Sequence, residues 1–115
     1  MLRLAAAPDT GVDWGLCSAI TRAHGRTFYL ASHFQAPARR RALHAIYAYC
    51  RVADDIVDCA ITHDEAAARL ADWAAQLDAP IHPIARAFFA TRMMYDIPVS
   101  PARDLIDGIR SDLQP

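Results

Sequence analysis

One stretch of the sequence, residues 47–58, constrains the fold and the chemistry more than any other. Read as an α-helix at about 100° per residue, it separates into two adjacent stripes. One stripe is polar: Tyr47, Arg51, Asp54 and Asp58. The neighbouring stripe is apolar: Leu43, Ile46, Cys50, Ala53 and Val57. The pattern predicts a helix that buries the apolar stripe and displays a hydroxyl, a guanidinium and two carboxylates beside it.

The polar stripe is costly, and the spacing alone leaves two interpretations open. Asp54 and Asp58 form a like-charge i,i+4 pair, unfavourable by about 0.2–0.5 kcal/mol. In the first interpretation, the patch is solvated and Arg51 pairs with Asp54 or Asp55 as an exposed salt bridge. In the second, the carboxylates hold a divalent cation. Mg²⁺ takes one or two carboxylates and completes its shell with water and substrate phosphate, so this pattern suits a metal–diphosphate complex.

The rest of the chain predicts further helices and no strand. Asp13, Thr62 and Ser100 are expected N-caps, and Pro37, Pro83 and Pro101 suit first helical turns. The expected helices cover residues 14–24, 27–35, 37–61, 63–77, 84–95 and 101–112. Leu70, Trp73 and Leu77 have core spacing, and so do Ala87, Phe88, Thr91, Met94 and Tyr95. The fold class is all-α.

A break at residues 24–27 separates the first two helices. His24, Gly25, Arg26 and Thr27 offer backbone amides, a hydroxyl, an imidazole and a guanidinium. Such a break either binds an anion at a helix start or is an ordinary helix junction, and the sequence leaves both open.

Composition excludes several classes of function. A net charge of −1 gives no general attraction to nucleic acid, so we expect no nucleic-acid partner. The single glutamate excludes a Glu-x-x-His di-iron bundle, and zinc-ligand spacings are absent. The five histidines are expected at the surface or as hydrogen-bonded core residues. Three unpaired cysteines and the lack of a signal-peptide pattern or long apolar run predict reduced, mostly buried thiols in a cytoplasmic protein.

The two ends of the sequence lead to expectations about domain organisation. Residues 1–12 are expected to form a flexible leader, and residues 13–115 to belong to one helical unit. The last helix offers Leu105 and Ile109 with no later segment to cover them. We therefore expect the chain to end before its fold is complete, with exposed apolar faces on the last two helices favouring self-association.

Three segments together resemble the phytoene/squalene synthase family. They are HGRTFYLAS at residues 24–32, RALHAIYAYCRVADDIVD at 41–58 and LIDGIRSDL at 105–113. The resemblance runs in order from Asp13 to Leu113 and is closest to phytoene synthases. It implies that the chain is the N-terminal part of an all-α isoprenoid synthase fold. It also implies head-to-head joining of two prenyl diphosphates, geranylgeranyl diphosphate in phytoene synthases, through a cyclopropyl diphosphate intermediate.

The resemblance also implies a set of site residues. The metal would be Mg²⁺, or Mn²⁺ in its place. Its ligands would be Asp54 and Asp58, with Asp55 as a third candidate. The substrate site would comprise His24, Gly25, Arg26, Thr27, Phe28, Tyr47 and Arg51. Catalysis would rest on Asp54, Asp58, Arg51 and Tyr47, because metal and arginine stabilise the departing pyrophosphate. The apolar product of such an enzyme also implies peripheral contact with a membrane.

Departures from the family pattern leave alternative functions open. Gly25 stands where many relatives carry a small hydroxyl residue, and the family's later Tyr-x-x-x-Val-Ala-Gly-Thr helix and second aspartate-rich motif are absent from these residues. The expectation is a phytoene-synthase-like portion that is inactive alone. The alternatives are a squalene or dehydrosqualene synthase-like enzyme, NADPH being needed only for the squalene type, and a non-catalytic helical remnant that binds prenyl diphosphate.

Overall fold

The computed structural model describes residues 11–113, which form six helices and no strand. The helices are α1 (Trp14–His24), α2 (Arg26–Ser32), α3 (Pro37–Cys59), α4 (His63–Ala75), α5 (Pro83–Tyr95) and α6 (Ser100–Asp112). The all-α class is confirmed. Most of the leader expected at residues 1–12 lies outside the described residues; within it, Val12 packs against the core.

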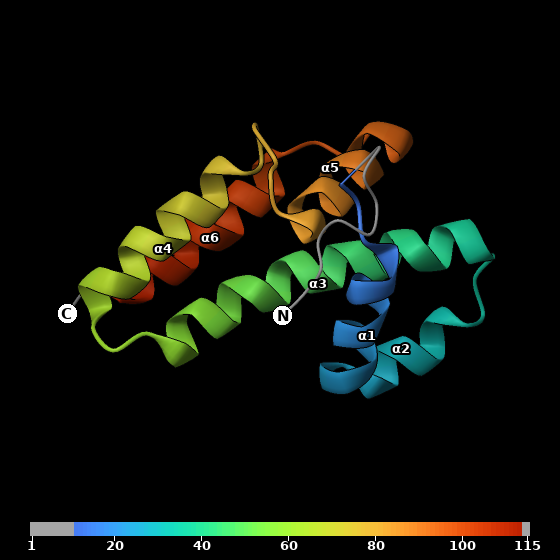
Figure 1. The fold of residues 1–115 in the computed structure, drawn as a ribbon, viewed down its shortest axis with the longest axis horizontal. Coiled ribbons are helices and arrows are strands. Elements are labelled where there is room, and N and C mark those ends of the chain that lie inside the picture. The colour runs from blue at the N-terminus through green and yellow to red at the C-terminus, as the bar shows by residue number, and fades with distance from the viewer. Residues whose placement is uncertain (1–10, 114–115) are drawn as a thin grey trace.

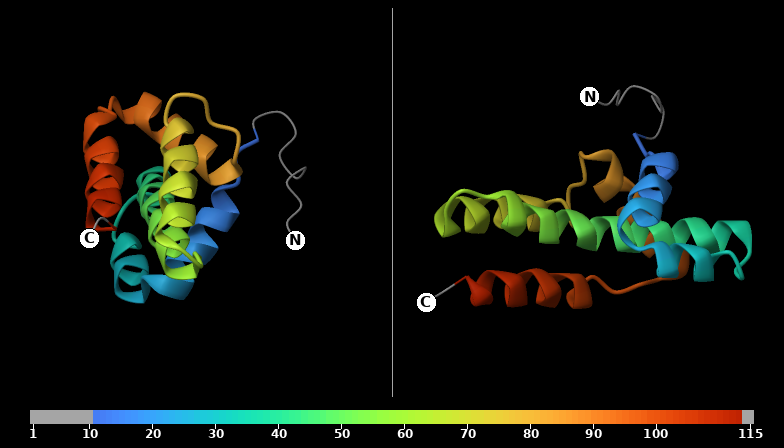
Figure 2. Two further views of the ribbon diagram at one scale, coloured as in Figure 1. Left: turned by 90° about the vertical axis from the view of Figure 1, so that its left-hand side faces the viewer. Right: turned by 90° about the horizontal axis from the view of Figure 1, so that it is seen from below.

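Helix α3 is the axis of the molecule (Figure 1). Its N-terminal half packs against α1 and α2, and its C-terminal half against α4. Helix α5 packs against α3 and α1, while α6 packs against α4 and runs parallel to α3 (Figure 2). Among residues 11–113, no helix is both long enough and apolar enough to cross a membrane.

The helix boundaries follow local capping chemistry. The Asp13 carboxylate accepts a hydrogen bond from Leu16 N–H at 2.9 Å, and Thr62 Oγ1 accepts one from Glu65 N–H at 3.1 Å. The caps expected at Asp13 and Thr62 are thus present, whereas the one expected at Ser100 is not, because α6 begins at Ser100 itself. Several other boundaries differ by one to three residues, the largest difference being at α2, which ends at Ser32.

The buried face of α3 differs from the predicted apolar stripe. Of that stripe, only Ala53 is fully buried; Leu43, Ile46, Cys50 and Val57 are half-buried. The fully buried residues are Ala42, His44, Ala45, Ala48, Tyr49, Ala53 and Ile56. Four alanines let α1, α4 and α5 approach the α3 backbone closely. Ile46, Cys50 and Val57 of the expected stripe instead line open spaces between α3 and α6.

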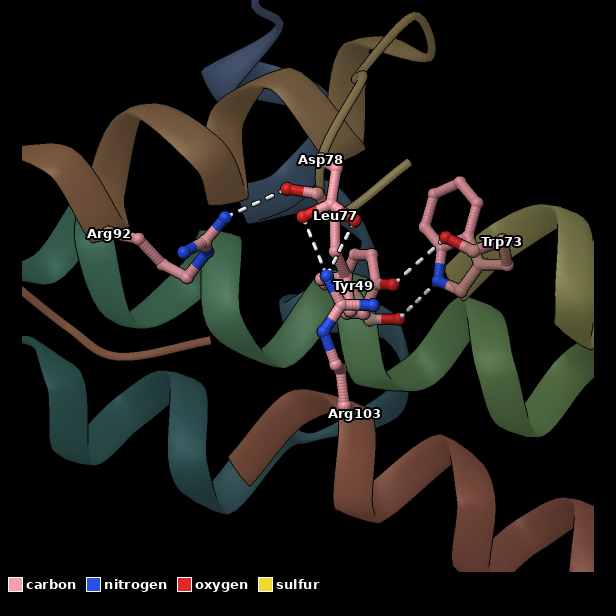
Figure 3. Close-up of polar contacts among 6 residues, drawn as sticks. All are labelled: Tyr49, Trp73, Leu77, Asp78, Arg92 and Arg103. Atoms are coloured by element: carbon pink, nitrogen blue, oxygen red, sulfur yellow. Dashed lines mark hydrogen bonds and ion pairs between the residues drawn. The ribbon is translucent and has the colours of Figure 1, made fainter. Parts of the chain in front are cut away.

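Tyr49 is the centre of the core. Its ring, 1% exposed, stacks against Trp73 at 4.8 Å and against Phe88 at 4.6 Å between centroids. Its hydroxyl donates to Trp73 C=O at 3.0 Å, and Trp73 Nε1–H donates to Tyr49 C=O at 3.1 Å (Figure 3). These contacts join α3, α4 and α5. As expected, Leu70, Trp73 and Leu77 are buried with them.

Polar contacts attach α5 and α6 to the end of α4. Buried Arg92 donates to Leu77 C=O at 2.8 Å, and Arg103 of α6 pairs with the Asp78 carboxylate (Figure 3). The outer ends of α5 and α6 are less covered. Met94 is 60% exposed and Tyr95 37%, so their expected burial is wrong. Ile109 packs at the edge of the core, whereas Leu105 is 41% exposed.

The three cysteines are free and differ in burial. Burial raises the pKa of the Cys17 thiol to about 12, with the charge of Asp13 adding to the effect. Cys50 is half-buried and Cys59 is exposed, so the expectation of mostly buried thiols fails at Cys59, which ends α3.

His44 is a hydrogen-bonded core histidine, as the sequence predicted. Both ring nitrogens have partners at 2.8 Å, Ser18 Oγ at Nδ1 and Ser32 Oγ at Nε2. Its pKa is lowered by burial and by the positive charges of His33 and Arg40. Burial also lowers the pKa of His82.

These depressed pKa values predict acid-sensitive stability. Below about pH 6.5, His44 and His82 bind protons more readily in the unfolded chain than in the folded chain. The free energy of unfolding should therefore fall as pH decreases. Urea unfolding followed by circular dichroism across that range measures this slope. Replacing His44 by glutamine should flatten it. A stability independent of pH between about 7 and 5.5 would contradict the assignment.

Candidate functional site

A polar groove lies between the C-terminal half of α3 and α6. It encloses about 320 Å³ and is lined by Arg51, Asp54, Val57, Asp58, Ile109, Asp112 and Leu113. The structure therefore brings Arg51, Asp54 and Asp58 of the predicted site to one groove. Asp112 faces them from α6 and was not among the predicted site residues.

Asp55 lies beside the groove rather than in its lining. Arg51 Nε is shielded from solvent and lies 3.1 Å from Asp55 Oδ1, as an ion pair without hydrogen-bond geometry. The two side chains are 29% and 46% exposed, so the pair contributes less than about 1 kcal/mol. Within residues 11–113, Asp54 and Asp58 form no ion pair. Two exposed carboxylates thus share a groove with no protein cation assigned to them.

The donor set of this groove suits Mg²⁺ bound together with a phosphate. In the part of the chain that the structure describes, no three His, Cys, Asp or Glu side chains are placed to hold a metal ion. A closed protein cage is therefore not present there. Carboxylate oxygens from Asp54 and Asp58 are nevertheless the hard ligands that Mg²⁺ prefers, and it usually completes its octahedron with water and substrate phosphate. The residues fit such a shared site.

The break between α1 and α2 lies against the polar stripe of α3 through Tyr47. Gly25 ends α1 and precedes α2, and a Cβ atom built on it would lie 2.8 Å from Tyr47 Cζ. The Phe28 ring stacks on Tyr47, with centroids 5.7 Å apart. Tyr47 lies one helical turn before Arg51, about 6 Å along the α3 axis. Gly25, Phe28 and Tyr47 therefore lie together next to the groove.

The other predicted residues of this break are at the surface. His24, Arg26 and Thr27 are exposed. Their proposed contacts with a diphosphate stay predictions, because the groove lining does not include them.

The close approach of Gly25 to Tyr47 makes a direct prediction. Replacing Gly25 by alanine should destabilise the chain by about 1–3 kcal/mol, because the new methyl group must displace the tyrosine ring. Gly108→Ala is the matched control. Nothing lies within 4 Å of a Cβ at Gly108 in the exposed middle of α6, so that change should stabilise by about 0.5–1 kcal/mol. Urea unfolding measures both, and equal effects would contradict the packing at Gly25.

An apolar cavity precedes the polar groove along the same two helices. It holds about 190 Å³ and is lined by Ile46, Cys50, Phe88, Ile97, Pro98, Pro101, Ala102 and Leu105. Residue numbers rise together on α3 and α6 from this cavity to the groove. Burial raises the pKa of Cys50, and the nearby charge of Asp54 adds to it. Cys50 lines the cavity and Asp54 lines the groove, so the two spaces adjoin along α3.

Sequence reasoning missed the α6 side of the groove. The signal was present, since Ile109, Asp112 and Leu113 belong to the LIDGIRSDL segment. What the sequence did not show is that α6 runs parallel to α3. That arrangement places Asp112 opposite Asp54 and Asp58.

Comparison with known proteins identifies relatives of this chain. The sequence model described as Squalene/phytoene synthase matches residues 21–115. A phytoene synthase of Arthrospira platensis is 35% identical over 112 residues, covering 92% of this chain and 36% of that protein. Phytoene synthase 3, chloroplastic, of Zea mays is 33% identical over 127 residues, covering 96% of this chain and 30% of that protein.

The chain spans about a third of the length of these relatives. No solved structure matches it significantly. The family match covers α2 to α6 entirely and includes both the polar groove and the apolar cavity. The chain therefore belongs to the squalene/phytoene synthase family.

Proposed function

We propose that this chain carries the first aspartate-rich motif of a phytoene-synthase-like prenyltransferase, in the N-terminal part of an isoprenoid synthase domain. The substrate is a prenyl diphosphate, geranylgeranyl diphosphate by analogy with the phytoene synthases it resembles. The observation that carries the proposal is the polar groove, where Arg51, Asp54 and Asp58 lie together directly after an apolar cavity. One end suits a metal-bound diphosphate and the other an isoprenoid tail.

Each part of the site has a chemical role in this proposal. Asp54 and Asp58 would hold Mg²⁺, or Mn²⁺ in its place, and Asp55 would orient Arg51. When bound, the metal would neutralise the charge that develops on the departing pyrophosphate. The Arg51 guanidinium would stabilise the same charge. Tyr47, fixed against Gly25 and Phe28, would position the diphosphate beside Arg51.

The apolar cavity would protect the reacting carbon. Ile46, Phe88 and Leu105 line it with hydrocarbon or aromatic groups, so that water stays away from the allylic cation formed when pyrophosphate leaves. Attack by the double bond of a second prenyl diphosphate on this cation would form a new carbon–carbon bond, and loss of a proton to the released pyrophosphate would close a cyclopropyl diphosphate. Departure of its own pyrophosphate, rearrangement of the resulting cation and loss of a further proton would give the head-to-head product.

A second candidate function is binding without turnover. Within residues 11–113 the groove is lined only by α3, α6 and Leu113, and the aromatic and methionine side chains at the end of α5 are exposed. On this ground the described chain is proposed to bind prenyl diphosphate but to be inactive alone. Self-association through these exposed faces, peripheral membrane contact and a cytoplasmic location belong to the same proposal. Squalene and dehydrosqualene chemistry remain the alternatives to phytoene, with NADPH needed only for squalene.

One experiment distinguishes the proposed function from its alternatives. The purified chain is titrated with a non-hydrolysable prenyl diphosphate by calorimetry, with Mg²⁺ or with EDTA, and is incubated with geranylgeranyl diphosphate and Mg²⁺. We expect magnesium-dependent binding and no phytoene. Turnover would refute the inactivity of the chain alone, and absence of binding in both buffers would refute the diphosphate site.

A further inference from the structure

A second cleft lies at the opposite end of α3, where α1, α2 and the first turns of α3 meet. It encloses about 570 Å³, and its polar lining comprises Ser18, Tyr29, His33, Arg40, Arg41 and His44. It shares no lining residue with the polar groove. Fourteen residues of helix separate Arg40 from Asp54, which is about 20 Å along the axis.

The helices that form this cleft carry an excess of positive charge. Residues 14–50 contain five arginines and no aspartate or glutamate, and Asp13 caps the start of α1. Three of those arginines, Arg39, Arg40 and Arg41, occupy the first two turns of α3, where the helix macrodipole disfavours cations. None of them forms an ion pair within residues 11–113. An anion bound here would compensate this charge.

The hydrogen-bond donors around the cleft have only some of their acceptors within the protein. Arg40 donates to Gln35 C=O at 3.2 Å, yet its Nε is shielded from solvent and has no acceptor. Arg41 lies over the Trp14 ring, 5.0 Å from its centroid, which fixes its direction without neutralising its charge. Ala36, the cap of α3, makes no side-chain cap hydrogen bond, so the first backbone N–H groups of this helix also lack a side-chain acceptor.

The back wall of the cleft is rigid. Tyr29 stacks on His44 with ring centroids 5.3 Å apart, and His44 is held between Ser18 and Ser32. His33 Nδ1 lies 2.9 Å from Tyr29 C=O. Because a carbonyl only accepts, Nδ1 carries the proton in this contact, and Nε2 of His33 is left for another partner. A rigid wall of this kind lowers the ordering cost when the neighbouring arginine donors bind an oxyanion.

We propose that this cleft binds an oxyanion of the phosphate class through Arg40, Arg41 and the start of α3. The site is separate from the proposed diphosphate groove. The ligand is either free phosphate or the phosphate of a lipid headgroup. Phe34, which is 91% exposed on the turn between α2 and α3, lies beside the cleft in sequence and would enter the acyl region if the phosphate belongs to a lipid.

The test uses the purified chain in magnesium-free buffer. Inorganic phosphate is titrated while backbone amide resonances are followed by NMR. Vesicles of phosphatidylcholine, with or without phosphatidylglycerol, are tested by co-sedimentation. We expect resonance shifts centred on residues 33–44 rather than 51–58, or sedimentation only with the phosphatidylglycerol vesicles. Phe34→Ser should reduce vesicle binding but leave phosphate binding unchanged.

Variants distinguish a built site from general surface charge. Arg40→Gln and Arg41→Gln should each weaken binding by about tenfold, the usual loss for a charge-assisted hydrogen bond. Arg39→Gln removes the same charge from the same helix turn but from outside the cleft lining, and should weaken it much less. If Arg40→Gln unfolds the chain, the comparison is made between Arg41→Gln and Arg39→Gln. Equal losses in all three variants, or binding of neither phosphate nor anionic vesicles, would overturn the proposal.

Discussion

Replacing Asp54 and Asp58 together by asparagine should abolish magnesium-dependent binding of a non-hydrolysable prenyl diphosphate. Both carboxylates line the polar groove and form no ion pair within residues 11–113. Asparagine keeps the size of the side chain but removes the charge that attracts Mg²⁺. We expect affinity in the presence of Mg²⁺ to fall at least about a hundredfold, to the value measured in EDTA.

The control for this variant is the double substitution Asp104→Asn and Asp107→Asn. It removes the same charge from exposed positions on α6 that do not line the groove. The control should bind like the original chain in calorimetry. If the Asp54/Asp58 variant also binds normally, the two carboxylates are a solvated patch and the first interpretation of the polar stripe is correct.

Replacing Tyr49 by alanine should cost about 3–5 kcal/mol of unfolding free energy. The ring is 1% exposed and lies between Trp73 and Phe88, so its removal leaves a cavity that connects three helices. It also removes the hydroxyl that donates to Trp73 C=O, which keeps only the Gln76 N–H as a donor. Small domains are stable by about 5–15 kcal/mol, so this variant should be close to unfolded at room temperature.

Tyr49→Phe separates packing from hydrogen bonding. It keeps the stacked ring and removes only the hydroxyl, so we expect a loss of about 1–2 kcal/mol. Urea unfolding followed by tryptophan fluorescence measures both variants. An alanine variant as stable as the phenylalanine variant would show that the stack is not the centre of the core.

Local chemistry made most of the fold predictable. Asp13 and Thr62 mark helix starts because their side chains satisfy free backbone N–H groups. Pro37 and Pro83 mark first turns because proline has no N–H to donate. The same reasoning failed at Ser100, where the proline that follows was read correctly but the helix includes the serine.

The buried face of α3 was not predictable from hydropathy. The largest apolar side chains, among them Ile46 and Val57, suggested one stripe. The structure buries a face of alanines around Tyr49 instead. Small residues contribute little to a hydropathy pattern, yet they decide how closely two helices approach. Only the positions of α1, α4 and α5 reveal which face is covered.

The residues that α3 contributes to the candidate site were predictable, and the residue that α6 contributes was not. Arg51, Asp54 and Asp58 share a groove because helical periodicity is a local property. Asp112 depends on the parallel arrangement of α3 and α6, which is a tertiary property. The contact of Gly25 with Tyr47 is tertiary as well. It gives Gly25 a packing role that the comparison of residue types alone did not suggest.

The most direct test of the central claim uses Mn²⁺ in place of Mg²⁺. Because Mn²⁺ is paramagnetic, it broadens NMR signals of nuclei close to it. We expect that Mn²⁺ added with a non-hydrolysable prenyl diphosphate broadens amide resonances around Asp54 and Asp58 first, and those around Asp112 next. Broadening centred elsewhere, or broadening that is the same in the Asp54/Asp58 variant, would contradict a metal–diphosphate site in this groove.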